Sequence, residues 1–316
     1  MKNLLILARP SADPWVSPSD GAKTERLKSG TASLTVTTDA TSPMLIDPVG
    51  PVLLLWGTLG LRPYVFAFLV VFLVAAGRDL GAGRAVSVLL WGFSVAWVAE
   101  YASTRVGVPF GLYHYTGLTK DLELYVLNVP FFDSLSFPFL AYAAFCRSRR
   151  ILGRRHGLAV VLLAGILMML LDVVIDPLAV RGDRWFLGRI FYYPAGGIYF
   201  GVPLSNFAGW ALVGWVIVGG YVTATTLAGP RSDKAAEGST SGGIALYYGV
   251  LLFNLAITAW IGEWTLMAAG ILVQVAAGLL LYVVGAKVRQ GRRSGAEVGH
   301  DRTSADSEKR RGSLRL

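Results

Sequence analysis

The chain has 316 residues, of which 54% are hydrophobic and 16% are charged, and its formal net charge is +9. Soluble domains are only about 45–50% apolar, so this composition excludes an ordinary soluble domain. With a mean hydropathy of +0.54, it predicts a protein that crosses a membrane several times. The single cysteine, Cys146, excludes an intrachain disulfide and is expected to be a small residue within a span. Three scattered histidines do not have the spacing of a zinc site, and we expect no metal, no organic cofactor and no nucleic-acid partner.

The basic excess is concentrated beside the predicted spans. Residues 147–155 contain five arginines and no acid, and residues 285–316 contain nine basic and four acidic residues. Such clusters mark cytoplasmic loops and attract anionic lipid. We therefore expect a multi-pass protein of the cell membrane whose basic C-terminal tail is cytoplasmic.

The first 48 residues show little hydrophobic periodicity and are rich in Ser, Thr, Pro, Asp and Lys. This composition predicts a disordered tail, and the run Leu4 to Ala8 is too short for the core of a signal peptide. Met44 stands just before the first apolar run, so a translation start there is the simpler expectation. A transmembrane domain is predicted over residues 49–285, followed by a basic disordered tail over residues 286–316.

The predicted fold is all-α, a polytopic transmembrane helical bundle of about seven spans. The first apolar run, Val52 to Ala76, is interrupted by Arg62-Pro63. Because Tyr64 to Gly77 alone reaches roughly 21 Å of a ~30 Å hydrocarbon core, we expect one kinked span from both halves. The other spans are expected at 85–103, 131–146, 158–176, 206–227, 244–261 and 265–284. Long outer loops then follow the second and fourth spans.

Carboxylates gather near the outer ends of these spans. Asp172 and Asp176 lie four residues apart and therefore share one helical face. Ionisable groups at membrane depth are costly and indicate a functional site. A plainer interpretation stays open, in which Asp176 caps the helix or pairs with an arginine and Asp172 only bonds a neighbouring helix. Three more carboxylates fall at the same depth, of which the last two have the plainer interpretation of interfacial charge: Glu100, Asp133 and Glu263.

The two outer loops are rich in aromatic residues, glycine and proline. These aromatics suit either an interfacial belt or the wall of a site for a hydrophobic ligand. Asn206 and Trp210 share a face at the start of the fifth span. The candidate substrate-binding residues are Tyr113, His114, Tyr115, Trp185, Tyr199, Phe200, Asn206 and Trp210.

Four stretches together resemble the membrane carotenoid biosynthesis proteins typified by bisanhydrobacterioruberin hydratase and the bacterial gamma-carotene hydratases. The likeness extends over about residues 50–285 and is most specific in the last two stretches. The resemblance implies addition of water across the terminal double bond of an acyclic carotenoid end group, which yields a tertiary alcohol. The stretches are Phe110-Gly-Leu-Tyr-His-Tyr-Thr116, Asn128-Val-Pro130, Leu171-Asp-Val-Val-Ile-Asp-Pro177 and Tyr199-Phe-Gly-Val-Pro-Leu-Ser-Asn-Phe-Ala-Gly-Trp210.

The residues fit this implied chemistry. Hydration of an alkene needs a proton delivered to carbon, a tertiary cation that survives briefly, and a positioned water. A carboxylic acid kept neutral by burial can supply the proton, and aromatic faces can stabilise the cation. Our hypothesis makes Asp172 the proton donor and Asp176 the group that keeps it protonated or positions water, with these roles exchangeable. Glu100 is the alternative acid; Asn206, Tyr113 and His114 are candidates for orienting water.

Two other functions stay open at this point. An intramembrane prenyltransferase would use Asp-x-x-x-Asp as half of a magnesium-diphosphate site, but residues 128–133 do not supply its second acidic motif. A non-enzymatic carotenoid- or lipid-binding protein would use the same aromatic loops. The expected partners are an acyclic carotenoid, the lipid bilayer and other membrane enzymes of the carotenoid pathway.

Overall fold

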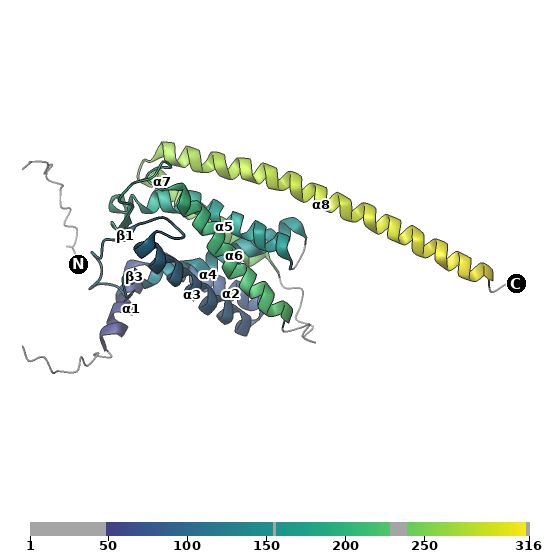
Figure 1. The fold of residues 1–316 in the computed structure, drawn as a ribbon, viewed down its shortest axis with the longest axis horizontal. Coiled ribbons are helices and arrows are strands. Elements are labelled where there is room, and N and C mark those ends of the chain that lie inside the picture. Colours follow the sequence, from purple (N-terminus) through teal and green to yellow (C-terminus); the bar gives the residue numbers. More distant parts are fainter. Residues whose placement is uncertain (1–48, 154–155, 228–238, 314–316) are drawn as a thin grey trace, which may run out of the picture. The chain divides into compact units, whose positions relative to one another are not determined.

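The computed structural model describes residues 49–153, 156–227 and 239–313. The tail predicted for residues 1–48, with its expected start at Met44, lies outside this part of the chain. The described residues form eight α-helices, a short 3-10 helix and four two-residue strands (Figure 1). The helices are α1 Val49–Leu61, α2 Pro63–Leu80, α3 Ala82–Val106, α4 Phe131–Leu152, α5 Leu158–Ala179, α6 Leu204–Leu227, α7 Ser241–Trp260 and α8 Trp264–Ser313.

The all-α, multi-pass architecture predicted from hydropathy is confirmed. Six helices of the described part are long and apolar enough to cross a membrane: α2, α3, α5, α6, α7 and the Trp264–Val288 part of α8. The total of seven spans stays a prediction. It depends on α4, which has the required length of 22 residues but carries three arginines near its end and is not among the six.

The expectation of one kinked span over Val52 to Ala76 was wrong. The structure has two separate helices there, because Arg62 has φ −124° and ψ 44°, outside the helical region. Pro63 begins α2, a position where its missing N–H costs no helical hydrogen bond. With 18 residues, α2 qualifies as a span without α1, and α1 is a 13-residue helix with exposed Leu53 and Trp56.

Helix α4 is the centre of the bundle. It contacts α2, α3, α5 and α7, and every residue from 137 to 146 is buried. Cys146 lies in this segment and is fully buried. Small residues let neighbouring helices approach closely: a Cβ added to Gly243 of α7 would come within 2.4 Å of Cys146 Sγ.

Helices α5 and α6 pack closely through glycines. A Cβ on Gly214 of α6 would lie 2.9 Å from Gly165 Cα of α5, and a Cβ on Gly165 would lie 2.6 Å from the Ala211 carbonyl. Replacing either glycine with a larger residue would push the two backbones apart. This contact matters for the site, since α5 carries Asp172 and Asp176 and the first turn of α6 carries Asn206.

The two long loops meet and pair with each other. Strand β1 (His114–Tyr115) of the first loop pairs antiparallel with β4 (Phe191–Tyr192) of the second. Within the first loop, β2 (Tyr125–Val126) pairs with β3 (Val129–Pro130), and the 3-10 helix η1 (Gly182–Arg184) begins the second loop. Figure 1 shows β1 and β3 at the end of the bundle where α1 lies. The two loops therefore lie together at the ends of α3, α4, α5 and α6 that they join.

Helix α8 continues to Ser313, whereas the sequence predicted a disordered basic tail from residue 286. The cytoplasmic side assigned to this segment and the division into a transmembrane domain and two tails stay predictions.

Candidate active site

The two aspartates of α5 are joined by one asparagine of α6. Asn206 Nδ2 donates hydrogen bonds to Asp172 Oδ2 and to Asp176 Oδ2, both at 2.7 Å. Asp172 and Asn206 are fully buried, with 0% and 1% of their surface exposed. One amide group has two N–H donors and can serve both carboxyl groups at once. The two aspartates that the sequence places four residues apart are thus bonded by the same residue of the neighbouring helix α6.

The pair is not neutralised by a cation. Among the described residues, no arginine, lysine or histidine forms an ion pair with Asp172 or Asp176. Asp172 Oδ1 is buried and has no hydrogen-bond partner in the described part of the protein. A buried charge is stable only when it is paired and hydrogen-bonded, so this site differs from a structural ion pair.

Two further carboxylates come from α3 and α4. Tyr115 Oη donates to Asp133 Oδ2 at 2.7 Å, and Ser134 Oγ donates to Glu100 Oε2 at 2.5 Å. Tyr113 Oη lies 3.4 Å from Tyr115 Oη. Burial, followed by the nearby carboxylates, raises the pKa of the Tyr113 and Tyr115 phenols well above the usual value. Both phenols are therefore neutral hydrogen-bond donors near pH 7.

These groups surround a small acidic pocket with an empty volume of about 300 Å³. Its polar lining comes from four helices and both loops: Glu100, Tyr113, Asp133, Asp176, Tyr193 and Asn206. Its apolar lining includes Trp210, which stacks on Phe137 with ring centroids 4.3 Å apart and planes inclined by 12°.

An apolar cavity of about 750 Å³ adjoins the acidic pocket. It lies between α2, α4, α5 and α7 under the second loop, and its walls are mainly aromatic and aliphatic, with Tyr64, Phe68, Phe139, Trp185 and Phe253 among them. Four residues line both spaces: Asp133, Asp176, Phe191 and Trp210. Two carboxyl groups thus stand at the boundary between a hydrophobic space and a polar one.

Most of the residues predicted from sequence come together here. Asp176, Glu100, Tyr113, Asn206 and Trp210 line the acidic pocket. Trp185 lines the apolar cavity, Tyr115 reaches the site through Asp133, and Asp172 reaches it through Asn206.

Three of the predicted binding residues lie elsewhere. His114 is exposed and packs edge-on against Tyr192, with ring centroids 5.9 Å apart. Tyr199 packs against Phe200 and Phe207 instead of lining either space. The Phe200 ring faces the Arg181 guanidinium at 5.8 Å. Their position in a family-like stretch did not indicate where their side chains point.

Asp133 is the main residue that sequence reasoning underestimated. It was counted among the gathered carboxylates but not among the candidate site residues, with interfacial charge as the plainer alternative, yet it lines both spaces. Glu263 does fit that interpretation, since it pairs with Arg184 and with Arg181, whose Nε lies 3.4 Å away. The available signal for Asp133 was its position directly after the loop turn at Pro130, at the depth of the other carboxylates.

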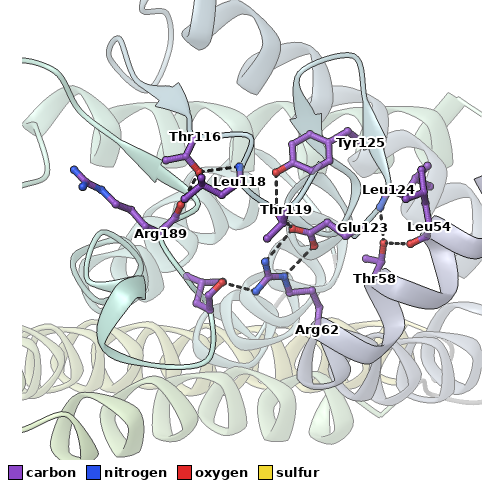
Figure 2. Close-up of polar contacts among 11 residues, drawn as sticks. Leu54, Thr58, Arg62, Thr116, Leu118, Thr119, Glu123, Leu124, Tyr125 and Arg189 are labelled. Atoms are coloured by element: carbon purple, nitrogen blue, oxygen red, sulfur yellow. Dashed lines mark hydrogen bonds and ion pairs between the residues drawn. The ribbon is translucent and has the colours of Figure 1, made fainter. Parts of the chain in front are cut away.

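A buried ion pair, also missed from sequence, fixes the wall of the apolar cavity. Arg62 donates to both carboxylate oxygens of Glu123, from Nε at 3.0 Å and from Nη2 at 2.9 Å, and to the Leu187 carbonyl at 2.6 Å (Figure 2). Its guanidinium also lies 4.5 Å from the centroid of the Phe132 ring. Leu187 and Phe132 both line the cavity, so one arginine ties the α1–α2 junction to both loops at the site.

Hydrogen bonds around Glu123 extend this connection. Thr119 Oγ1 donates to Glu123 Oε1 at 2.5 Å and lies 2.9 Å from Tyr125 Oη. Thr58 of α1 accepts a hydrogen bond from the Leu124 amide at 2.8 Å. Figure 2 shows these two groups of hydrogen bonds side by side near Arg62. Within the described residues, no group of three or more His, Cys, Asp and Glu side chains is placed to hold a metal ion.

Known proteins similar to this chain belong to carotenoid biosynthesis. Residues 60–283 match the model of a family described as carotenoid biosynthesis protein. A curated relative, the bisanhydrobacterioruberin hydratase of Haloarcula japonica, is 32% identical over 181 residues, which cover 55% of this chain and 55% of the relative. The chain thus aligns with about half the length of that relative. No solved structure matches the chain. With a family match over most of its helical part, the chain belongs to the carotenoid biosynthesis proteins, as a multi-pass membrane member.

Proposed function

We propose that this protein is a carotenoid hydratase, which adds water across the terminal C=C bond of an acyclic carotenoid end group to give a tertiary alcohol. The observation that carries the proposal is the position of Asp133 and Asp176, which line both the apolar cavity and the acidic pocket. Hydration of an alkene brings a hydrophobic substrate, a proton and a water to one point. The family and the hydratase relative support the same class of reaction.

The apolar cavity is the proposed place for the end group of the carotenoid. Its aromatic and aliphatic walls suit an isoprenoid chain that arrives from the bilayer. The acidic pocket is the proposed place for water, since Tyr113, Asn206 and the carboxyl groups offer it hydrogen bonds. Other membrane enzymes of the pathway are the expected source of the substrate.

The reaction balances with carboxyl groups alone. A carboxylic acid gives its proton to the less substituted alkene carbon, and the π electrons form the new C–H bond. The tertiary cation left on the other carbon faces Trp210, whose ring can stabilise positive charge. Water adds to this carbon to form the C–O bond, and its surplus proton passes to a carboxylate. The substrate gains H and OH while the number of acidic protons in the site is unchanged.

Within this scheme we assign proton delivery to Asp176 and a supporting role to Asp172. The sequence left the two roles exchangeable. Of these two aspartates, Asp176 lines the apolar cavity and Asp172 does not. Asp172 is linked to Asp176 through the shared Asn206 amide. Asp133, which accepts a hydrogen bond from Tyr115, is the proposed acceptor of the water proton, because a hydrogen bond to a carboxylate favours its charged form. Glu100 lies on the water side and stays the alternative acid.

The test is expression in a host that accumulates an acyclic carotene, followed by mass analysis of the extracted pigment. The wild type is expected to add the mass of one water, and Asp176→Asn and Asp172→Asn are expected to abolish that product while the protein stays in the membrane. Glu263→Gln is the matched control, because Glu263 pairs with arginines away from both spaces. Retained hydration in both aspartate variants would contradict the assignment. Unmodified carotenoid that copurifies with the wild type would instead indicate the non-enzymatic binding protein.

A further inference from the structure

A second space lies at the opposite end of α4 from Asp133, and we call it the arginine cleft. It is bounded by the end of α4 (residues 147–153), the first half of α7 and residues 278–288 of α8. Its empty volume is about 1240 Å³, open space included. Since 22 residues of α-helix extend about 33 Å, this cleft is remote from the acidic pocket.

The charged residues among the described lining of the arginine cleft are both basic. They are Arg147 and Arg150, and the described lining includes no Asp or Glu. Arg149, on the same turn of α4, shows the contrast: it donates to both oxygens of Asp79 at 2.8 and 2.9 Å. Arg150 is exposed and forms no ion pair with a described residue. Among the described residues, Arg149 alone of these three has an anionic partner, and cationic groups at the membrane surface attract anionic lipid.

One of the two arginines is held in place by aromatic rings. The Arg147 guanidinium lies 4.4 Å from the Tyr247 ring centroid and 5.0 Å from that of Tyr248. Such stacking orients the flat guanidinium and leaves N–H groups at its edge for a planar or tetrahedral anion. The Arg147 guanidinium is therefore held in a fixed orientation for a ligand. The exposed Arg150 side chain can turn toward a ligand bound there.

The rest of the cleft is suited to hydrocarbon. Ile151, Ile244, Leu281 and Val288 contribute apolar walls beside the two arginines. The wall that α8 contributes belongs to the spanning part of this helix. Only 6% of that part is buried within the bundle, so it is open to lipid. A free inorganic anion would use the arginines but not these walls.

We propose that the arginine cleft binds an anionic phospholipid, with its phosphate on Arg147 and Arg150 and one acyl chain along α8. Guanidinium groups bind phosphate through paired, charge-assisted hydrogen bonds, and basic pockets between transmembrane helices are suited to lipid headgroups. The cleft also lies on the arginine-rich side of the membrane, where the sequence places the cytoplasmic leaflet. The proposal concerns a site separate from the acidic pocket and does not depend on the hydratase function.

The test uses the full chain purified in detergent, with lipid binding followed by native mass spectrometry. Phosphatidylglycerol and phosphatidylcholine are the two probes. The wild type is expected to retain phosphatidylglycerol in preference, and the Arg147→Gln/Arg150→Gln double variant is expected to lose about tenfold in its affinity, as for the loss of charge-assisted hydrogen bonds. Arg78→Gln is the matched control, because Arg78 is exposed in the last turn of α2 outside the cleft.

Two further measurements separate the possible outcomes. Soluble glycerol phosphate distinguishes a lipid from a free phosphate: the proposal expects it to compete poorly, and Leu281→Asn is expected to weaken phosphatidylglycerol alone. If the double variant misfolds, Arg150→Gln alone at this exposed position is expected to lower the preference by about threefold, as for one lost hydrogen bond. Equal retention of both lipids by the wild type would overturn the proposal, as would equal losses in the double variant and in Arg78→Gln, or binding of glycerol phosphate as tight as that of the lipid.

Discussion

Two groups of charges lie near the end of the bundle that carries the two long loops, and their partners differ. Arg62 and Glu123 are 1% and 0% exposed, and each charge meets its opposite through two hydrogen bonds. Asp172 and Asp176 share one asparagine, have no cation partner among the described residues and leave one buried oxygen without a hydrogen bond. The Arg62–Glu123 pair contacts the cavity wall at Leu187 and Phe132, whereas the aspartate pair is the one to which we assign the proposed chemistry.

This difference shows how to distinguish structure from function among charges in a membrane protein. Burial alone does not separate the two groups, because Asp172 is as completely removed from solvent as Arg62 and Glu123 are. The hydrogen-bond partner separates them. Each charge of the ion pair is neutralised by the other, whereas carboxyl groups that share an amide keep protons that they can exchange in the proposed reaction. Variants of each group should therefore affect different properties.

The largest effect is expected from Asp176→Asn. The amide has nearly the same shape but no acidic proton, so hydration should fall by about 10²–10⁴-fold, the usual contribution of a positioned acid. Thermal stability in detergent should change little, because Asn206 can still bond one side of the new amide. Product yield per unit of membrane protein measures the first effect. A large loss of stability with unchanged product per folded molecule would show that Asp176 has a structural role, like the one given to the Arg62–Glu123 pair.

Arg62→Leu is expected to act on stability first. It leaves Glu123 buried without a partner, which costs about 3–5 kcal/mol, and it releases the Leu187 carbonyl from its hydrogen bond. The measurement is thermal unfolding of the purified protein. The double variant Arg62→Leu/Glu123→Leu is the control, because removal of both charges should recover much of this loss. No recovery in the double variant would show that the loop contact to Leu187 matters more than the charge pair.

Tyr115→Phe probes the link between the phenols and Asp133. It removes the donor to Asp133 Oδ2, and a hydrogen bond to a charged group contributes about 1.5–3 kcal/mol. If Asp133 acts as a carboxylate, hydration should fall roughly tenfold or more. Tyr192→Phe, at an exposed position of β4, is the matched control and should leave hydration unchanged. Equal hydration in Tyr115→Phe and the wild type would remove Asp133 from the mechanism.

The smallest effect is expected from Glu263→Gln. Glu263 is 21% exposed and pairs with arginines that are themselves 23% and 45% exposed, and such pairs contribute about 0–1 kcal/mol. Thermal unfolding should shift only slightly, and hydration should match the wild type. A loss of product here would mean that a surface ion pair controls the site, and the contrast between matched and unmatched charges would fail.

Hydropathy and spacing alone determined the all-α membrane architecture and the approximate limits of most helices. The reason is local: apolar runs of this length have few other solutions in a bilayer. The four-residue spacings of Asp172 with Asp176 and of Asn206 with Trp210 also predicted shared faces correctly. These features depend on neighbours along one helix, which a sequence displays directly.

Only the tertiary structure decided which distant residues meet. Arg62 and Glu123 are 61 positions apart, and their pairing depends on how the first loop folds back over α1 and α2. The break at Arg62 is local by contrast, because proline disfavours the helical conformation of the residue before it. Asp133 lines both spaces, whereas His114, Tyr199 and Phe200 line neither, and this depends on how the loops and helices pack. The local sequence determines the helices, and the long-range packing of the loops determines which residues meet at the site.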